Sequence, residues 1–305
     1  MNAGRVAVVD IGSNSIRLFL CEGVGPAGPE GERLTTITGL RRGAAPDGAV
    51  TREALGRLAE CLAIYRGRID AFGLDGRIIA VGTSAVRDAP NRDAIEAVVT
   101  DGLGAELRVL AGAHEAELSY VGARLAVDGN GPVIVMDIGG GSTELVRGDT
   151  AGPTSAVSLD VGAVRFTERF LHHDPPTEDE VMELRREVAT MAVPALSALG
   201  GAAPMIGVAG TMTSLAAIAH GAYEPDRVHG AILAAAEVEE IATHLASIPL
   251  DERRLVPGLH PERATSIVAG SLIVATVLAA AGADEIAVSE RDLLDGAVLR
   301  LAASG

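Results

Sequence analysis

The stretch VAVVDIGSNSIRL, residues 6–18, has a close counterpart in VIVMDIGGGSTEL, residues 133–145. Each begins with an apolar run that ends in an aspartate, continues through a turn of small residues and returns to a second run. Matching positions along this 13-residue strand-turn-strand segment make a chance recurrence improbable. The sequence therefore predicts a duplicated unit that opens twice with the same strand, turn and strand.

The segments after each repeat also correspond. After the first we expect a third strand near residues 34–40, beyond the Gly/Pro-rich loop GVGPAGPEGE, and then helices alternating with strands. A strand at 155–159 and the same alternation follow the second repeat. The turn-rich segment DGNGP, Asp128–Pro132, marks the predicted boundary between a domain of residues 1–130 and one of residues 131–305. The predicted fold class is α/β, with the site in the cleft between the two copies.

Apolar periodicity and capping residues place the remaining elements. The expected strands are Arg77–Val81, Leu107–Leu110, Met205–Ala209 and Glu285–Ser289. One expected helix begins at Thr51, and a second runs through Ile95 and Val98. Further helices are expected at Ala113–Val127, Thr177–Leu199, Met212–Ala219, Glu237–Ser247, Glu262–Ala281 and Asp292–Ala302. GTSAVRDAPN is expected to be a loop, and the last helix is a candidate to pack back on the first domain.

Composition excludes several function classes. A formal net charge of −16 argues against general binding of nucleic acid or anionic membranes, which requires a basic field. The first apolar run lacks the pattern of a signal peptide, and the run Ile267–Ala283 is shorter than a membrane span of about 20 residues, so we expect a buried helix there. Cys21 and Cys61 are expected to be reduced, mostly buried thiols in a cytoplasmic protein.

The two small-residue turns are candidate phosphate sites. GSNS (Gly12, Ser13, Asn14, Ser15) and GGGS (Gly139, Gly140, Gly141, Ser142), followed by Thr143, are small enough for backbone N–H groups to reach a ligand phosphate. Neither is a Walker A loop, because G-K-[ST] is absent. A glycine turn that only closes a hairpin is the alternative for each.

The acidic residues around the turns are candidate metal ligands. Asp10, Asp137 and Glu144 offer hard oxygen donors that suit Mg²⁺, with Mn²⁺ as the second choice. Aspartates that merely accept hydrogen bonds from the turns are the alternative. At one aligned position the first repeat has Arg17 where the second has Glu144. We interpret this mismatch as a division of labour, with a cation for phosphate in one half and a carboxylate for metal in the other.

Three further features could serve the chemistry. Glu115 falls in the first turn of a helix, where the helix dipole favours an ionised carboxylate able to accept a proton, although simple capping is the alternative. Arg87 follows a strand end and could bind phosphate, but could also be an ordinary surface arginine. Gly210 and Thr211 open a helix after a strand, as in an anion or nucleotide site, although tight packing is equally compatible.

The ordered set of motifs resembles the exopolyphosphatase/guanosine pentaphosphate phosphohydrolase (Ppx/GppA) family, a branch of the actin, sugar-kinase and heat-shock-chaperone superfamily. The matching segments are VDIGSNSIRL, GTSAVRDAPN, LAGAHEAEL, MDIGGGSTEL, SLDVGAVRFTE, GVAGTMTSLAAI, RVHGAIL and VSERDLLDG. The resemblance implies two ribonuclease H-like domains and a metal-dependent hydrolase that releases orthophosphate. It implies that Glu115 activates the attacking water, that Asp10, Asp137 and Glu144 surround the metal, and that both turns bind phosphate with Arg17 and Arg87.

The chain departs from the family pattern in three places. His114 replaces a glutamate beside Glu115, Thr265 replaces an aspartate in Arg-Ala-Asp, and we expect no counterpart of the C-terminal helical domain of longer members. The last departure leads us to expect a preference for short polyphosphate chains.

Several functions remain open at this point. Polyphosphate is the preferred substrate and guanosine pentaphosphate the alternative. A kinase or ATPase of the same superfamily and a non-catalytic sensor of polyphosphate or an alarmone are further alternatives. The apolar late helices are compatible with a homodimer.

Overall fold

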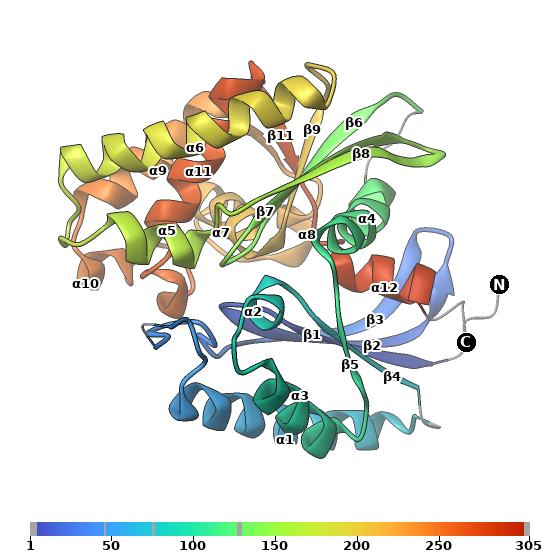
Figure 1. The fold of residues 1–305 in the computed structure, drawn as a ribbon. Helices are drawn as coiled ribbons and strands as arrows, with labels where there is room; N and C mark the ends of the chain where they lie inside the picture. The colour runs from blue at the N-terminus through green and yellow to red at the C-terminus, as the bar shows by residue number, and fades with distance from the viewer. Residues whose placement is uncertain (1–4, 46, 75–76, 127–129, 302–305) are drawn as a thin grey trace. The chain divides into compact units, whose positions relative to one another are not determined.

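The computed structural model describes residues 5–45, 47–74, 77–126 and 130–301 (Figure 1). The chain forms two compact units, one of Met1–Leu118 with Leu293–Gly305 and one of Ser119–Asp292. This division by contacts falls inside a helix instead of at residue 130, and it assigns the last helix to the first unit.

The sheet of the first unit has five strands in the order β3-β2-β1-β4-β5. Its strands are β1 (Val6–Ile11), β2 (Ser15–Gly25), β3 (Gly28–Ile37), β4 (Ile78–Gly82) and β5 (Leu107–Val109). β1, β2 and β3 form an antiparallel meander, whereas β4 and β5 run parallel to β1. This strand order is that of a ribonuclease H-like fold.

The sheet of the second unit repeats this design and adds one strand, in the order β10-β11-β9-β6-β7-β8. Its strands are β6 (Val133–Ile138), β7 (Thr143–Asp149), β8 (Gly152–Leu159), β9 (Met205–Val208), β10 (Ile232–Ala234) and β11 (Glu285–Val288). β6, β7 and β8 are again an antiparallel meander, and β9 and β11 follow in parallel. The predicted fold class, two ribonuclease H-like α/β units, is therefore confirmed.

Helices surround both sheets (Figure 1). In the first unit they are α1 (Arg52–Phe72), α2 (Ser84–Arg87), α3 (Arg92–Leu103) and α12 (Leu293–Leu301). In the second they are α5 (Ala163–Phe170), α6 (Glu178–Ala198), α7 (Ala209–His220), α8 (Pro225–Val228), α9 (Ala235–Ser247), α10 (Leu250–Arg253) and α11 (Ile267–Ala281). α4 (Gly112–Ala123) continues as a 3₁₀ turn at Arg124–Ala126, and Pro261–Arg263 forms another.

Several elements differ from the predictions. GVGPAGPEGE is the hairpin that joins β2 to β3, because the two strands stay paired as far as Gly25 and Gly28. β3 is an edge strand, so Pro29 interrupts no internal ladder. The expected loop GTSAVRDAPN contains the short helix α2, and the sequence did not predict α5, α8, α10 or β10. Part of the predicted linker Asp128–Pro132 lies outside the described residues.

The two faces of the first sheet carry different helices. Ala7, Val9 and Ile11 pack with residues of α1 and α3, whereas Val6 and Val8 pack with Leu294 and its neighbours on α12. Figure 1 shows α1 and α3 on one face of this sheet and α12 on the other. Because successive side chains of a strand point to opposite faces, the uninterrupted apolar run of β1 serves both cores.

α12 docks through a backbone contact and an ion pair. A Cβ added to Gly296 would collide with the carbonyl group of Leu118 in α4. Asp295 is fully buried and accepts a hydrogen bond from Arg33 of β3 at 2.7 Å, and this guanidinium also lies 3.9 Å from the centroid of the Phe19 ring. These contacts hold the last helix on the first unit.

Gly296→Ala is therefore expected to lower the free energy of unfolding by about 1–3 kcal/mol, because the new methyl group meets backbone that has no rotamer to change. Urea-induced unfolding measures this change. Gly67→Ala is the matched control, since Gly67 is an exposed helical glycine with no atom within 4 Å of an added Cβ. The control is expected to stabilise α1 by up to about 1 kcal/mol. Equal effects of the two substitutions would contradict the close-contact argument.

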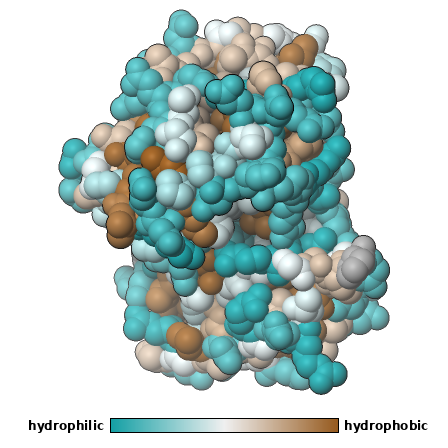
Figure 2. Space-filling model, turned by 90° about the vertical axis from the view of Figure 1, so that its left-hand side faces the viewer, coloured by the Kyte–Doolittle hydropathy of each residue, from teal (hydrophilic) through white to brown (hydrophobic). Residues whose placement is uncertain are grey.

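α11 forms the centre of the second core. Its residues from Ile267 to Leu278 are all buried, and Gly282 ends the helix in the left-handed conformation. This confirms the predicted buried helix within Ile267–Ala283. Among the residues described, none of the helices combines the length and apolarity that crossing a membrane requires. The face drawn in Figure 2 is mainly hydrophilic, with scattered apolar patches.

The N-terminus of α6 is closed by a capping box. Thr177 Oγ1 accepts the amide of Glu180, and the Glu180 carboxylate accepts the amide of Thr177 at 2.9 Å, the amide of His172 and a hydrogen bond with His173. Burial raises the pKa of Glu180, but these hydrogen bonds outweigh it and lower the pKa to about 2.

The pH dependence of stability follows from this shift. Because the pKa of Glu180 falls from 4.5 to about 2 on folding, its stabilising effect is present above pH 4.5 and is lost as pH falls toward 2. We expect Glu180→Gln to flatten the dependence of Tm on pH between these values, as measured by circular dichroism melts. Glu178→Gln, an exposed first-turn residue of the same helix, is the control. An unchanged slope in Glu180→Gln would contradict the assignment.

Candidate functional site

The two repeated turns adopt the same backbone structure. In the first, the Gly12 amide donates to the Ser15 carbonyl at 3.1 Å, and in the second the Gly139 amide donates to the Ser142 carbonyl at 2.9 Å. A Cβ on Gly12 would lie 2.8 Å from the Ser15 carbonyl oxygen, closer than a side chain tolerates. The sequence repeat is thus a structural repeat down to a single hydrogen bond.

Each turn is held through its carbonyl groups. In the first turn the Asn14 carbonyl accepts the amides of Thr38 and Gly39, and the Ser13 carbonyl accepts the amide of Arg41. These donors come from the segment that follows β3.

In the second turn the donors come from α5. The Gly139 carbonyl accepts the Ala163 amide, and the Gly140 carbonyl accepts the amides of Val164 and Arg165. Arg165 Nε also donates to the Gly141 carbonyl at 2.7 Å. The missed helix α5 therefore supports the predicted phosphate turn.

The amide groups of the turns are left available. Within the described part of the chain, no protein acceptor is found for the amides of Ser13, Asn14, Gly140, Gly141 and Ser142. Successive N–H groups that the fold does not use are the usual basis of a backbone anion site. The predicted role of both turns in phosphate binding stays a prediction, and this geometry supports it.

Two oxygens next to the first turn are also unsatisfied. Asn14 Oδ1 and Thr38 Oγ1 are buried and lack a hydrogen-bond partner among the described residues. Buried polar atoms are normally paired, so such atoms point to a water or ligand at this place. The sequence reasoning included Asn14 but missed Thr38, which no local motif marks.

The mismatch between the repeats produces two different cross-strand pairs. Asp10 of β1 faces Arg17 of β2 in register, and Asp10 Oδ2 accepts Arg17 Nε at 3.0 Å and Nη2 at 2.7 Å. At the equivalent place Asp137 of β6 faces Glu144 of β7. The first unit therefore carries an ion pair where the second carries two carboxylates.

The carboxylate pair of the second unit fits a hard cation. Asp137 is 8% exposed and Glu144 is 1% exposed, and residues directly opposite in an antiparallel pair share one face of the sheet. Like charges so placed repel, and a divalent cation with oxygen preference relieves that repulsion. No group of three or more His, Cys, Asp or Glu side chains in the described ranges is arranged to hold a metal ion. The metal set of Asp10, Asp137 and Glu144 stays a prediction.

Serine hydroxyls contact both carboxylates. Ser119 of α4 donates to Asp137 Oδ2 at 2.5 Å, and Ser158 of β8 donates to Glu144 Oε1 at 2.8 Å. The sequence reasoning missed both serines. The only local signal for Ser119 is its position one helical turn after Glu115.

Glu115 lies in the first turn of α4, as the sequence predicted. Its side chain is buried, and Glu115 Oε2 accepts a hydrogen bond from Arg87 Nη1 at 3.0 Å. The same Nη1 atom donates to the Leu110 carbonyl at 2.9 Å. Arg87 thus contacts the predicted base directly through a charge-assisted hydrogen bond. His114 is exposed, as expected.

Gly210 and Thr211 lie at the start of α7, as predicted. Ala209, the first residue of the helix, has a φ of 68°, a conformation unusual for a residue other than glycine. A Cβ on Gly210 would collide with the guanidinium of Arg263, so the glycine admits a close cation contact. This close contact supports tight packing, the alternative explanation for Gly210. A phosphate-binding role for Gly210 and Thr211 stays a prediction.

The duplicated meander, the paired turns and the buried carboxylates define a two-unit ribonuclease H-like protein with candidate phosphate and metal groups in both units. The family model described as the Ppx/GppA phosphatase family matches residues 32–304. The chain belongs to this family and is a hydrolase.

Relatives and solved structures agree with that membership. Exopolyphosphatase 2 of Mycobacterium tuberculosis is 39% identical over 317 residues, covering 98% of each chain. A crystal structure of an exopolyphosphatase-like protein shares 33% identity and a TM-score of 0.91, covering 98% of this chain and 99% of that one. An exopolyphosphatase from Cytophaga hutchinsonii shares 27% identity and a TM-score of 0.89, covering 98% of each chain.

Proposed function

We propose that the protein is an exopolyphosphatase that hydrolyses the terminal phosphoanhydride bond of inorganic polyphosphate and releases orthophosphate. The observation that carries the proposal is Glu115, a buried carboxylate held by Arg87 at 3.0 Å, in a chain 39% identical to Exopolyphosphatase 2. A buried carboxylate held in place by an arginine is suited to serve as a general base.

In the proposed reaction Glu115 accepts a proton from a water molecule as the water oxygen bonds to the terminal phosphorus. The bridging P–O bond then breaks, and its electron pair leaves with the shortened chain. The amides of Ser13, Asn14, Gly140 and Gly141 bind and orient phosphate oxygens, and they offset the charge that develops there. Arg87 keeps Glu115 oriented.

A divalent metal is part of the proposal, and the oxygen donors of Asp137 and Glu144 would hold it, with Asp10 as the third predicted acid. When bound, Mg²⁺ supplies charge neutralisation on phosphate oxygens. Arg17 keeps its predicted phosphate role in this proposal, and its guanidinium is also paired with Asp10 at 2.7 Å. We propose that this pair orients Arg17 toward phosphate and limits the negative charge in the first unit.

Phosphate release from defined substrates tests the proposal. We expect release from short polyphosphate in the presence of Mg²⁺ and a loss of release with a chelator. Faster turnover of guanosine pentaphosphate than of polyphosphate would identify the alternative substrate. Binding of polyphosphate without release would establish a sensor. Equal turnover of short and very long chains would contradict the expected preference for short ones.

A further inference from the structure

Ser119 makes a contact that the proposed mechanism does not yet use. Its side chain is fully buried on α4, and its hydroxyl donates to Asp137 Oδ2 at 2.5 Å. The two residues lie 18 positions apart in the sequence and belong to the same compact unit. A buried hydroxyl that reaches out of its own helix to a buried carboxylate is a specific contact that invites a functional explanation.

The direction of this hydrogen bond is unusual for a helical serine. Hydroxyl groups inside helices commonly bond a carbonyl three or four residues earlier. In α11, Ser271 donates to the Val268 carbonyl at 2.9 Å and Thr276 donates to the Leu272 carbonyl at 2.7 Å. Ser119 instead donates to a strand residue. Its hydroxyl therefore orients a carboxylate instead of satisfying its own helix.

The position of α4 in the second unit is well constrained. A Cβ on Gly122 would collide with the backbone of Asp292, so the helix lies against that segment at backbone distance. Two residues before Gly122, Tyr120 Oη donates to the Asp149 carbonyl at 2.9 Å. With the helix held at both residues, the Ser119 hydroxyl presents a fixed donor to Asp137.

The Ser119 hydroxyl is one of two serine donors that bond the carboxylate pair of the second unit. Asp137 and Glu144 face each other across β6 and β7, and each has one oxygen bonded by a serine hydroxyl. Donors that bond the outer oxygens of ligating carboxylates orient them and tune the site. Ser158 is exposed, whereas Ser119 is excluded from water, so the Ser119 bond has no competing solvent.

We propose that Ser119 is a positioning residue that holds Asp137 for a divalent cation, an inference that rests on the proposed function. α4 carries Glu115 and Ser119 four residues apart, and such residues lie on one face of a helix. The helix that carries the proposed general base thus also carries the group that we propose orients a metal ligand.

Direct metal binding tests the inference without relying on turnover. We expect Ser119→Ala to bind Mg²⁺ about 10–100-fold more weakly than the wild type by calorimetry, with the same loss for Mn²⁺ by electron paramagnetic resonance. Ser119→Cys, which keeps a weak donor of similar size, is expected to lie between the two. High Mg²⁺ should restore the kcat of Ser119→Ala, because the carboxylates themselves remain.

Ser271→Ala is the matched control, since Ser271 is also fully buried in a helix of the same unit but its hydroxyl donates to a backbone carbonyl, that of Val268. Its metal affinity should equal that of the wild type. Unchanged affinity in folded Ser119→Ala would overturn the positioning role, and so would an equal loss in Ser271→Ala. Absence of metal binding by the wild type would overturn the metal part of the proposed function as well. If Ser119→Ala does not fold, Ser119→Cys decides the question.

Discussion

Glu115→Gln is expected to lower the kcat for phosphate release from short polyphosphate by about 10²–10⁴-fold, the range for losing a general base. The amide has the same shape and can still accept a hydrogen bond from Arg87, which lies 3.0 Å from the carboxylate. It cannot take a proton from the attacking water. The KM is expected to change little, because the amides of the turns are intact.

Glu117→Gln is the matched control for this experiment. Glu117 lies two residues further along α4, is partly exposed and is 3.9 Å from Arg300, with no role in the proposed reaction. Its kcat should remain within about twofold of the wild type, since surface ion pairs contribute little. A fully active Glu115→Gln, with or without an effect of Glu117→Gln, would refute Glu115 as the base.

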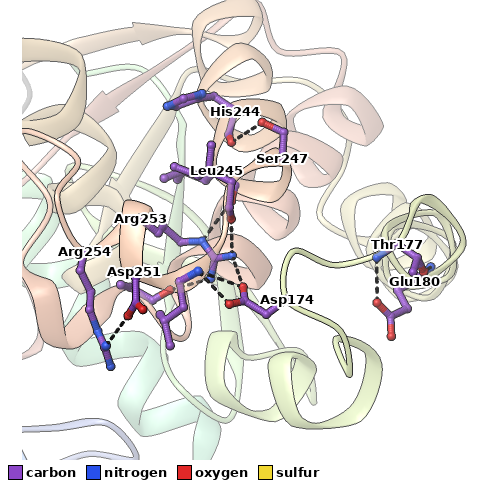
Figure 3. A network of polar contacts seen from close by, with 12 residues as sticks. Asp174, Thr177, Glu180, His244, Leu245, Ser247, Asp251, Arg253 and Arg254 are labelled. Atoms are coloured by element: carbon purple, nitrogen blue, oxygen red, sulfur yellow. Dashed lines mark hydrogen bonds and ion pairs between the residues drawn. The ribbon is translucent and has the colours of Figure 1, made fainter.

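The second large effect concerns Arg253, which is only 4% exposed. Its guanidinium donates to the carbonyl groups of Leu245, Ile248 and Ala264 at 3.0, 2.8 and 3.1 Å. It also pairs with Asp174 at 3.0 Å, and Asp174 in turn accepts the amide of Leu250 (Figure 3). One side chain thus connects the end of α9, α10, the segment before α11 and the loop before α6.

Arg253→Met is expected to lower the free energy of unfolding by about 3 kcal/mol or more, roughly 1 kcal/mol for each carbonyl left without its donor. The ion pair adds little, because the side chain of Asp174 is 49% exposed. Arg253→Lys keeps the charge but lacks the fork of donors, and its loss should be intermediate. Denaturant-induced unfolding measures these changes.

Arg254→Met provides the comparison for Arg253→Met. The side chain of Arg254 is 48% exposed. Its contact drawn in Figure 3 is a local ion pair with Asp251 at 2.9 Å. A loss of less than about 0.5 kcal/mol is expected there. Similar losses at Arg253 and Arg254 would show that the buried network contributes little to stability.

Much of the fold could be predicted because its signals are local. The apolar runs of β1 and β6, the Thr51 cap of α1 and the Thr177 cap of α6 lie where the sequence placed them. Not every element was readable in this way. β10 is three residues long and exists through its pairing with β11, far along the chain. The extension of β3 to Gly28 is local, but it was missed because the Gly/Pro-rich stretch suggests a loop although Gly25 pairs with Gly28.

The sequence also indicated the candidate site where its residues lie in local motifs. The sequence alone singled out the two aspartates, the two turns and Glu115 as candidates, because a repeated motif and a helix start are readable over a few residues. It could not show that Arg87 donates to Glu115, 28 residues away, or that Arg17 is held by Asp10. Such contacts depend on how strands and helices meet.

The sequence by itself determined that this protein is a duplicated α/β hydrolase with paired small-residue turns and a set of acidic residues. The tertiary structure alone decided what the mismatch of Arg17 and Glu144 means, since cross-strand register makes one pair an ion pair and the other two buried carboxylates. It also decided that Ser119 reaches Asp137. The physical reason is range: periodicity and turn chemistry act over a few residues, whereas hydrogen bonds between elements require the packed fold.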